Sequence, residues 1–498
     1  MTDNPVADLS EQERVRRGKR RRLIESGEGV YPITVPRTRT LRDLRQSYDD
    51  TGLEPGAETT DEVAVAGRVI YLRDTGKLCF VRLREGDGTE LQVMLSSADV
   101  GADRLETFKA MVDIGDHLGA VGRVVMSRRG ELSVRAHTWQ LAAKALRPLP
   151  GEHHVLSDEG RVRQRYLDMI VRPEAREMVR AKAQVLKSLR STLDSRDYIE
   201  VDTPVLQLTN GGAAARPFRT HLNTFDQEML LRIALELDLK RAMVGGVDRV
   251  FEIGKTFRNE GIDSTHSVEF LMLEAYEAYG DYESMMDLVQ ALVVDAGLAL
   301  GRTVVPARDG TEIDLEVEWR RATLLELVSG AMGETVTVDT DLETMRRVAN
   351  SREVELRPTW GTAEILLELY EQLVEHTLIQ PTFVCDYPER IRPLAKAHRS
   401  TPGLVEAFDL VINGVELVAA YSELNDPVLQ RSRLEDQARQ VAEGNPEAND
   451  VDEVFLRALE HGMPPAGGMG MGVDRLLMLL MGTGIRETIL FPLLRPET

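Results

Sequence analysis

The sequence predicts an α+β protein of several domains, in which a small β-barrel precedes a larger domain built on an antiparallel sheet flanked by helices. The chain has 498 residues, enough for about two to four domains of ordinary size. Short apolar runs separated by glycine-rich or charged turns fill residues 62–145, a texture typical of all-β structure. Beyond residue 171, strand-like runs alternate with long helical patterns, as in domains that combine helices with an antiparallel sheet.

The composition is that of an ordinary globular protein with an acidic excess. Against 82 Asp and Glu there are 61 Lys and Arg, a net charge of -21, which disfavours a general nucleic-acid coat protein unless the basic residues are concentrated. Cys79 and Cys385 are too far apart for a Cys-x-x-Cys motif, and this favours a reducing compartment. No apolar run reaches the length of a membrane span. We therefore expect a soluble cytoplasmic protein without membrane contact.

Residues 1–61 are predicted to form a basic N-terminal extension. Its cluster of positive charge contains no acidic residue and consists of Arg14, Arg16, Arg17, Lys19, Arg20, Arg21 and Arg22. Such a run is either a solvated helix or a nucleic-acid contact, and the cluster alone favours neither.

Residues 62–145 are predicted to form the barrel, for which the OB-fold is one candidate. Gly86-Asp87-Gly88 between two strand-like runs is a hairpin signal. OB barrels bind single-stranded nucleic acid by stacking bases on aromatic rings. Phe80 lies within a strand and could be such a platform, although a strand Phe is more often a core residue. Pro148-Leu149-Pro150-Gly151 then marks an interdomain hinge over 146–170.

Residues 171–498 are predicted to form the larger domain, with a helical insertion at about 280–400. Pro173 opens a long amphipathic helix, which leads through Tyr198 to the extended Thr203-Pro204. Strand-like runs at 228–235, 249–258, 268–276 and 407–421 alternate with helical stretches at 236–244, 281–300 and 361–378.

One candidate site lies on a hairpin whose two strand-like runs, 249–260 and 269–276, flank a polar loop. Period-two alternation groups charged and aromatic side chains on shared faces. These side chains are Arg258, Glu260, Phe270, Glu274 and Tyr276. Arg suits bidentate phosphate binding and Phe can stack on a base, whereas simple charge pairing across an exposed hairpin is the alternative.

A second hairpin is indicated by Asn413-Gly414. A two-residue turn there places Glu416 opposite Val411 and diagonal to Asp409 on the same face, and two carboxylates suit Mg²⁺. The same alternation puts Glu423 on the face opposite to Glu416 unless a bulge intervenes, so parity leaves their sharing of a pocket open.

A glycine-rich run, 467–472, leads into Val473-Asp474-Arg475 and an apolar helix. Glycines allow close backbone approach, and a helix N-terminus favours anions. The run lacks the spacing of the common nucleotide-binding glycine motifs, so a phosphate site here needs support from other residues.

Taken together, these segments resemble a class II aminoacyl-tRNA synthetase, and their local sequences are similar to bacterial lysyl-tRNA synthetases. Motif 1 of that class is similar to Tyr198 through Pro204, motif 2 to Phe257 through Gly261, and motif 3 to Gly470 through Arg475. The lysine-specific segments are similar to Gly211-Gly212-Ala213, Leu235-Glu236-Leu237, Met272 through Tyr276, and Tyr421 through Asp426.

The resemblance implies a fold and a set of partners. The barrel would be an OB-fold anticodon-binding domain, and residues 171–498 would be the class II catalytic domain, which dimerises through motif 1. The substrates would be L-lysine, ATP and tRNA(Lys), with Mg²⁺ as cofactor, and the activity that of an AMP-forming lysine–tRNA ligase.

The resemblance also implies roles for single residues. Arg258 and Arg475 would be catalytic. Lysine would be bound by Gly212, Glu236, Arg258, Glu274, Tyr276 and Glu423. ATP would be bound by Arg258, Glu260, His266, Phe270, Gly472 and Arg475. Asp409 and Glu416 would hold Mg²⁺. Phe80 and the basic cluster at 14–22 would contact tRNA.

Three departures from the family pattern stand close to these residues. The motif 2 loop has Thr265 in place of a phosphate-facing Arg, and Ala234-Leu235 stands where the family has Ala-Pro. Val418-Ala419-Ala420 replaces a Gly-Asn-Gly or Gly-Asn-Ala segment, which removes an Asn that would bind the substrate carboxylate. Two other functions stay open: transfer of lysine or a related diamino acid to an acceptor other than tRNA, and a catalytically silent RNA-binding protein.

Overall fold

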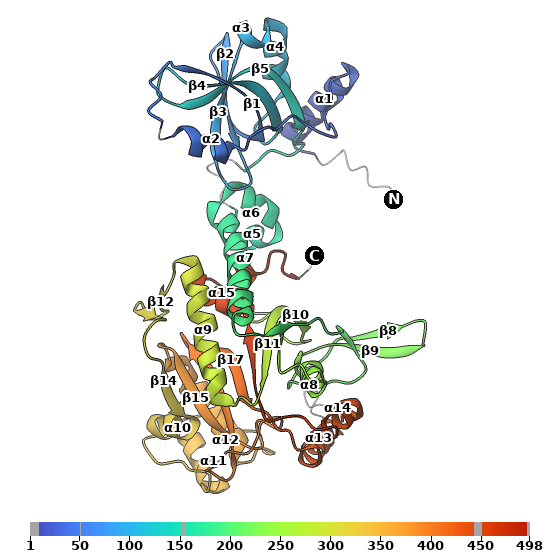
Figure 1. The fold of residues 1–498 in the computed structure, drawn as a ribbon, viewed down its shortest axis with the longest axis vertical. Coiled ribbons are helices and arrows are strands. Elements are labelled where there is room, and N and C mark those ends of the chain that lie inside the picture. Colours follow the sequence, from blue (N-terminus) through green and yellow to red (C-terminus); the bar gives the residue numbers. More distant parts are fainter. Residues whose placement is uncertain (1–8, 50, 151–155, 443–450, 496–498) are drawn as a thin grey trace. The chain divides into compact units, whose positions relative to one another are not determined.

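The computed structural model describes residues 9–49, 51–150, 156–442 and 451–495. The chain divides into two compact units, Met1–Arg176 and Glu177–Thr498, whose elements are labelled in Figure 1. No helix in the described ranges combines the length and the apolar composition needed to cross a membrane.

The first unit contains a closed five-stranded barrel, which confirms the predicted all-β domain. Its strands follow the order β1-β2-β3-β5-β4 around the barrel. They are β1 (Glu58–Asp74), β2 (Leu78–Arg84), β3 (Glu90–Ser96), β4 (His117–Met126) and β5 (Leu132–Ala143). Helices α3 (Ser97–Val100) and α4 (Ala102–Met111) lie between β3 and β4 in the chain. Alternate strand residues such as Val81 and Val93 are fully buried inside the barrel, as expected for closed sheets.

The segment before the barrel belongs to the same core. Helix α1 (Glu11–Glu25) starts with a capping box between Ser10 and Glu13, and α2 (Leu41–Tyr48) follows. Leu23 of α1 and Leu44 of α2 are buried in the barrel's hydrophobic cluster. The stretch predicted as a basic extension is therefore an integral part of the barrel unit, since its apolar residues complete that core.

Much of the stretch predicted as a hinge is helical. It contains α5 (Asp158–Arg163) and α6 (Arg165–Val171), and α7 (Pro173–Asp194) follows as the single long helix expected from the sequence. Asp168 is fully buried and accepts hydrogen bonds from Arg165 at 3.0 Å and from Arg172 Nη2 at 2.9 Å.

The second unit is built on an eight-stranded sheet with the order β14-β15-β16-β17-β18-β11-β10-β6. Its strands are β6 (Ile199–Glu200), β10 (Arg249–Phe257), β11 (Glu269–Ala278), β14 (Arg320–Thr323), β15 (Thr382–Pro388), β16 (Leu404–Ile412), β17 (Val415–Ser422) and β18 (Ala466–Gly472). The pairs β10–β6 and β14–β15 are parallel, and the others are antiparallel. The predicted antiparallel sheet is thus confirmed.

Helices cover this sheet in two groups. Helices α9 (Tyr282–Leu300) and α15 (Val473–Met481) pack their apolar residues into the largest core cluster together with the sheet. A second cluster joins α10 (Leu324–Met332), α11 (Leu342–Ser351) and α12 (Thr362–Leu373) to the β14–β16 end of the sheet. The segment at about 280–400 is therefore mixed rather than purely helical, because β14 and β15 within it join the main sheet.

Smaller elements complete this unit. They are β7 (Leu206–Gln207), β8 (Arg219–Leu222), β9 (Gln227–Leu231), α8 (Glu236–Val244), β12 (Val304–Pro306), β13 (Glu312–Asp314), η1 (Glu375–Thr377), α13 (Pro427–Ala442), α14 (Glu453–Leu459) and α16 (Ile485–Thr488). Strands β7, β9 and β8 form a separate three-stranded sheet.

Candidate active site

A pocket of about 350 Å³ lies over the middle of the large sheet, and its floor is a strand made largely of glycine. Strand β18 runs between β11 and β17, where Gly468 pairs with both Tyr276 and Tyr421. A Cβ on Gly468 would lie 1.9 Å from Glu423 Oε1 and 2.5 Å from the Tyr276 ring, so only glycine fits. The glycine-rich run is thus a strand whose missing side chains leave space for the pocket, and α15 begins only after this strand.

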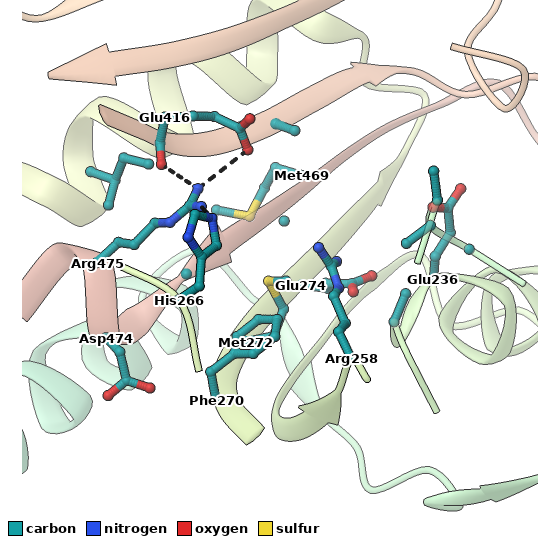
Figure 2. Close-up of a pocket in the computed structure, with 18 of the residues that line it drawn as sticks. Glu236, Arg258, His266, Phe270, Met272, Glu274, Glu416, Met469, Asp474 and Arg475 are labelled. Carbon is teal, nitrogen blue, oxygen red and sulfur yellow. Dashed lines mark hydrogen bonds and ion pairs between the residues drawn. The ribbon is translucent and has the colours of Figure 1, made fainter. Parts of the chain in front are cut away.

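One end of the pocket is acidic. Figure 2 shows Glu236 at this end, with Glu274 and Arg258 between it and the opposite end. The Glu236 carboxylate accepts a hydrogen bond from the Tyr421 hydroxyl at 2.8 Å. Gly212 also lines this end, and its φ of +88° places it in the region that favours glycine.

Glu274 lies between two donors. Its Oε1 accepts a hydrogen bond from the backbone N–H of Leu235 at 2.8 Å, and its Oε2 accepts one from the Tyr276 hydroxyl at 3.0 Å. Burial, together with the nearby Glu236 charge, raises the pKa of Glu274 to about 7. A carboxyl with such a pKa is poised to ionise when a cation arrives.

An internal ammonium lies behind this acidic end. Lys240 of α8 is fully buried, and its Nζ forms ion pairs with Glu236 Oε1 at 2.6 Å and with Glu423. Burial by itself lowers the pKa of Lys240, but the Glu236 and Glu423 charges outweigh it and the pKa lies above its usual value. Sequence reasoning missed Lys240, although its i,i+4 spacing from Glu236 on one helix was an available signal.

A β-bulge in β17 decides whether Glu416 and Glu423 lie on the same face of the strand. Val411 pairs with Glu416, as the two-residue turn predicts, but Leu410 pairs with Val418, so β17 holds one extra residue. Glu416 and Tyr421 therefore both line the pocket, and the alternation continues to Glu423 on the same side. Glu423 itself lies beneath Gly468 and is 1 % exposed.

The other end of the pocket is cationic and aromatic. The Arg258 guanidinium lies 5.3 Å from the centre of the Phe270 ring, and burial lowers the pKa of Arg258. Arg475 of α15 donates from Nη1 to the Glu416 backbone carbonyl at 2.7 Å, and its Nη2 lies 3.4 Å from His266 Nε2, as Figure 2 shows. Glu260 and Gly472 line the same pocket.

The two residues predicted to hold Mg²⁺ stand on neighbouring strands. Asp409 Oδ2 accepts hydrogen bonds from the Tyr387 hydroxyl at 2.7 Å and from Arg392, whereas Oδ1 is buried and has no hydrogen-bond partner among the described residues. Burial raises the pKa of Asp409, Arg392 opposes that shift, and Glu416 adds to it. An orphaned carboxylate oxygen beside a second, partly exposed carboxylate fits a divalent cation that retains water and phosphate ligands.

On the barrel, Phe80 faces outward. The buried residues of β2 alternate with it, and the Arg73 guanidinium lies 4.6 Å from the centre of its half-exposed ring. Phe80 therefore lies on the outer face of the barrel rather than in its core, with Arg73 over its ring.

The basic cluster on α1 divides into two sets. Arg16 is 9 % exposed and donates to the carbonyls of Ile114 at 2.9 Å and Ala145 at 3.2 Å, while Lys19 pairs with Asp113 at 2.6 Å. These two residues attach the helix to the barrel. The exposed members are Arg14, Arg17, Arg21 and Arg22, and Arg20 is half-buried.

Comparison with known proteins agrees with this geometry. Residues 157–495 match the family described as tRNA synthetases class II (D, K and N), and residues 63–142 match the OB-fold nucleic acid binding domain. A lysine–tRNA ligase of Kineococcus radiotolerans is 52% identical over 497 residues, 99% of each chain. Lysine–tRNA ligase 1 of Mycobacterium tuberculosis is 50% identical over 99% of this chain and 98% of its own.

A further relative is a bifunctional protein with a different name. The lysylphosphatidylglycerol biosynthesis bifunctional protein LysX of Mycobacterium ulcerans is 45% identical over 99% of this chain, which covers 44% of that longer protein. The full-length relatives and the family match give the same answer, a class II tRNA synthetase. This chain therefore belongs to the class II tRNA synthetases, in the group of the lysine–tRNA ligases.

Proposed function

We propose that this protein is an ATP-dependent lysine–tRNA ligase, which activates L-lysine to lysyl-adenylate and then transfers lysine to the 3′ end of tRNA(Lys). The observation that carries the proposal is the polarity of one pocket, with Glu236 at one end, Glu274 and Arg258 in the middle, and Arg475 toward the other end. A zwitterionic substrate with an additional ammonium matches this polarity, because a buried cation is tolerated only where carboxylates pair with it.

In the first step, the lysine carboxylate attacks the α-phosphorus of ATP in line and pyrophosphate leaves. Both reactants are anionic there, so the protein's task is to position them and to neutralise charge. Arg258, half-buried against Phe270, would contact the lysine carboxylate and the α-phosphate. Adenine would lie between Phe270 and Arg475, and Glu260 and His266 would contact the nucleotide at the same end.

The amino-acid end would select lysine by charge. Gly212 and Glu236 would receive the α-ammonium, and Glu274, Tyr276 and Glu423 would surround the side-chain ammonium. Because Glu423 is already paired with Lys240, it would contribute as part of a cluster in which one ammonium lies between two carboxyl groups, Glu236 and Glu423. An acidic amino acid would meet like charge here.

Asp409 and Glu416 would hold Mg²⁺ that arrives with the nucleotide. Bound there, the metal would offset phosphate charge during activation. Arg258 and Arg475 supply the protein's own positive charge at the same centre.

In the second step, a ribose hydroxyl at the tRNA 3′ end attacks the carbonyl carbon of the adenylate, and AMP leaves. The barrel would bind the anticodon through Phe80 and basic side chains of α1. A cytoplasmic location, consistent with two free cysteines, completes this part of the proposal.

The protein would act as a homodimer formed through the motif 1 region. Exposed apolar side chains gather after α7, where Ile199 is 56 % and Leu208 is 65 % exposed. A dimer interface in this region would cover these side chains. Light scattering coupled to size-exclusion chromatography should give about twice the mass of the chain.

The decisive experiment is ATP–pyrophosphate exchange across the standard amino acids, followed by charging of bulk tRNA. Exchange with lysine and charging of tRNA(Lys) are expected. Exchange with lysine without charging would favour transfer to another acceptor, and absence of exchange with every amino acid would favour a catalytically silent protein.

A further inference from the structure

We propose that Arg392 binds the carboxylate of the substrate amino acid. This inference deepens the proposed function and rests on it. It concerns a residue that lies in an irregular segment after β15, outside the three sequence motifs of the family, and whose guanidinium forms part of the pocket wall.

Arg392 is held in place from behind. One guanidinium nitrogen, Nη2, donates to Asp409 Oδ2, and the guanidinium carbon lies 4.7 Å from the centre of the Tyr387 ring. Tyr387 in turn donates its hydroxyl to the same Asp409 oxygen at 2.7 Å. These contacts fix a long side chain before any ligand binds, which lowers the conformational entropy lost on binding.

The anchoring leaves donors free for a ligand. A guanidinium carries five N–H groups, and within the part of the chain that the structure describes, Asp409 is the one hydrogen-bond partner of the Arg392 guanidinium, through Nη2. The side chain retains 25% exposure, and it shares the pocket with Glu416, Ala419 and Tyr421. The remaining donors are therefore available to an anion in the pocket.

The Arg392 guanidinium lies close to the place of a hydrogen-bond donor that the family has and this chain lacks. Ala419 stands where the family pattern has an Asn for the substrate carboxylate, and Ala419 has no side-chain donor. Ala419 is the direct cross-strand partner of Asp409, the residue that anchors Arg392. The Ala419 side chain is therefore next to Asp409 and to the Arg392 guanidinium that Asp409 anchors. In this arrangement Arg392 would replace the contact that the family Asn makes with the substrate carboxylate.

Charge favours the same assignment. During activation a carboxylate and a phosphate must approach each other, and the pocket wall also carries Glu236, Glu274 and Glu416. A further fixed guanidinium in the pocket wall, in addition to Arg258 and Arg475, would stabilise this approach, and the gain is large in a site with little water.

The test is lysine binding measured by calorimetry without ATP or Mg²⁺, so that only the amino acid supplies a carboxylate. L-lysine is compared with L-lysinamide, which carries a neutral amide instead. In R392Q the dissociation constant for lysine should rise about tenfold to hundredfold, as for loss of one charged hydrogen bond. The constant for lysinamide should stay within about twofold of the wild type.

Three variants separate substrate binding from a structural role. R392Q/D409N removes both charges of the buried pair, so recovery of lysine affinity in the double variant would mean that Arg392 merely neutralises Asp409. R390Q changes an arginine two residues away that pairs with Glu364 outside the pocket, and it should bind lysine normally. R392K keeps the positive charge if R392Q folds poorly, and it should still weaken lysine binding severalfold.

Two further outcomes would overturn the inference. Unchanged lysine affinity in R392Q or R392K would overturn it. If the KM for ATP rose in the same variant, the anion bound by Arg392 would be the α-phosphate rather than the lysine carboxylate. Equal weakening of lysine and lysinamide would also overturn the inference. Failure of the wild-type protein to bind lysine would instead refute the proposed function, so the two failures are distinguishable.

Discussion

Lys240 Nζ lies 2.6 Å from Glu236 Oε1, one turn apart on α8 and fully buried behind the acidic end of the pocket. The same ammonium also pairs with Glu423. The pocket proposed for a lysine substrate therefore has a lysine of the protein directly behind its wall. This internal cation lies between two buried carboxyl groups, and Glu274 is a further carboxyl of the pocket whose ionisation a second ammonium would favour.

Replacing Lys240 should destabilise the fold. K240M leaves Glu236 and Glu423 buried without their cation, and loss of one partner of a buried ion pair costs about 3 to 5 kcal/mol. Urea unfolding monitored by circular dichroism measures this change. K240M/E423Q should regain part of the stability, because one unpaired charge is removed.

The matched control is K255M. Lys255 pairs with Glu269 at 3.2 Å on the surface, and such exposed pairs contribute only about 0 to 1 kcal/mol. Equal stability losses in K240M and K255M would contradict the importance of the buried pair.

Glu274 should contribute to the way in which the free energy of unfolding changes with pH. The pKa of this residue is about 7 in the fold, against an ordinary value of 4.5. Between these values the folded protein holds a proton that the unfolded chain has lost, so the free energy of unfolding should fall as pH rises through this window. Urea titrations at several pH values between 4.5 and 8 measure the slope.

E274Q should make that slope shallower, because Gln does not titrate. E316Q, at an exposed position in the same unit, is the control and should leave the slope as in the wild type. A slope in E274Q identical to that of the wild type would show that Glu274 does not titrate in this window.

Lysine affinity should respond to pH in the opposite direction. A bound ammonium favours the ionised carboxylate, so lysine binding should tighten as pH rises from 6 to 8 through the pKa of Glu274, by up to about tenfold per pH unit below that pKa. Calorimetry at constant ionic strength measures it. E274Q should bind lysine more weakly and with less dependence on pH.

Much of the site could be predicted from the sequence because it lies on regular hairpins. The Val411–Glu416 pairing follows from a two-residue turn, and the sheet confirms it. Period-two alternation likewise brings Arg258 and Glu274 to one pocket, where both are found. In these segments local geometry alone determines which side chains meet.

The remainder depends on tertiary structure. The extra residue at Leu417 changes the parity of β17, and no local signal marks such a bulge. Arg392 lies in an irregular segment, so no periodicity predicts that it reaches Asp409. The burial of Lys240 depends on the packing of α8 against β11 and α14 and on Glu423, and these parts of the fold are distant from α8 in the sequence.

Phe80→Ala should weaken tRNA binding without affecting the fold. Its ring faces outward from the barrel, and stacking of one base contributes about 1 to 3 kcal/mol, so the dissociation constant for tRNA(Lys) should rise about 5-fold to 150-fold. Filter binding measures the constant. Lysine-dependent pyrophosphate exchange should be unchanged.

The control for this variant is F225A, which removes a ring that is 76 % exposed in the other unit. It should leave tRNA binding as in the wild type. An F80A variant that also binds tRNA normally would exclude Phe80 as a stacking platform.

The exposed arginines of α1 should determine part of the salt dependence of tRNA binding. Replacing Arg14, Arg17, Arg21 and Arg22 by Gln keeps a helix former at each position and preserves the contacts of Arg16 and Lys19 with the barrel. If all four contact phosphates, the slope of log K against log salt should become shallower by about three units. Melting temperature and pyrophosphate exchange should not change. An unchanged slope would mean that these four side chains are only a solvated face of the helix. The control variant is R16Q, which removes an internal contact and should lower the melting temperature whether or not α1 binds tRNA.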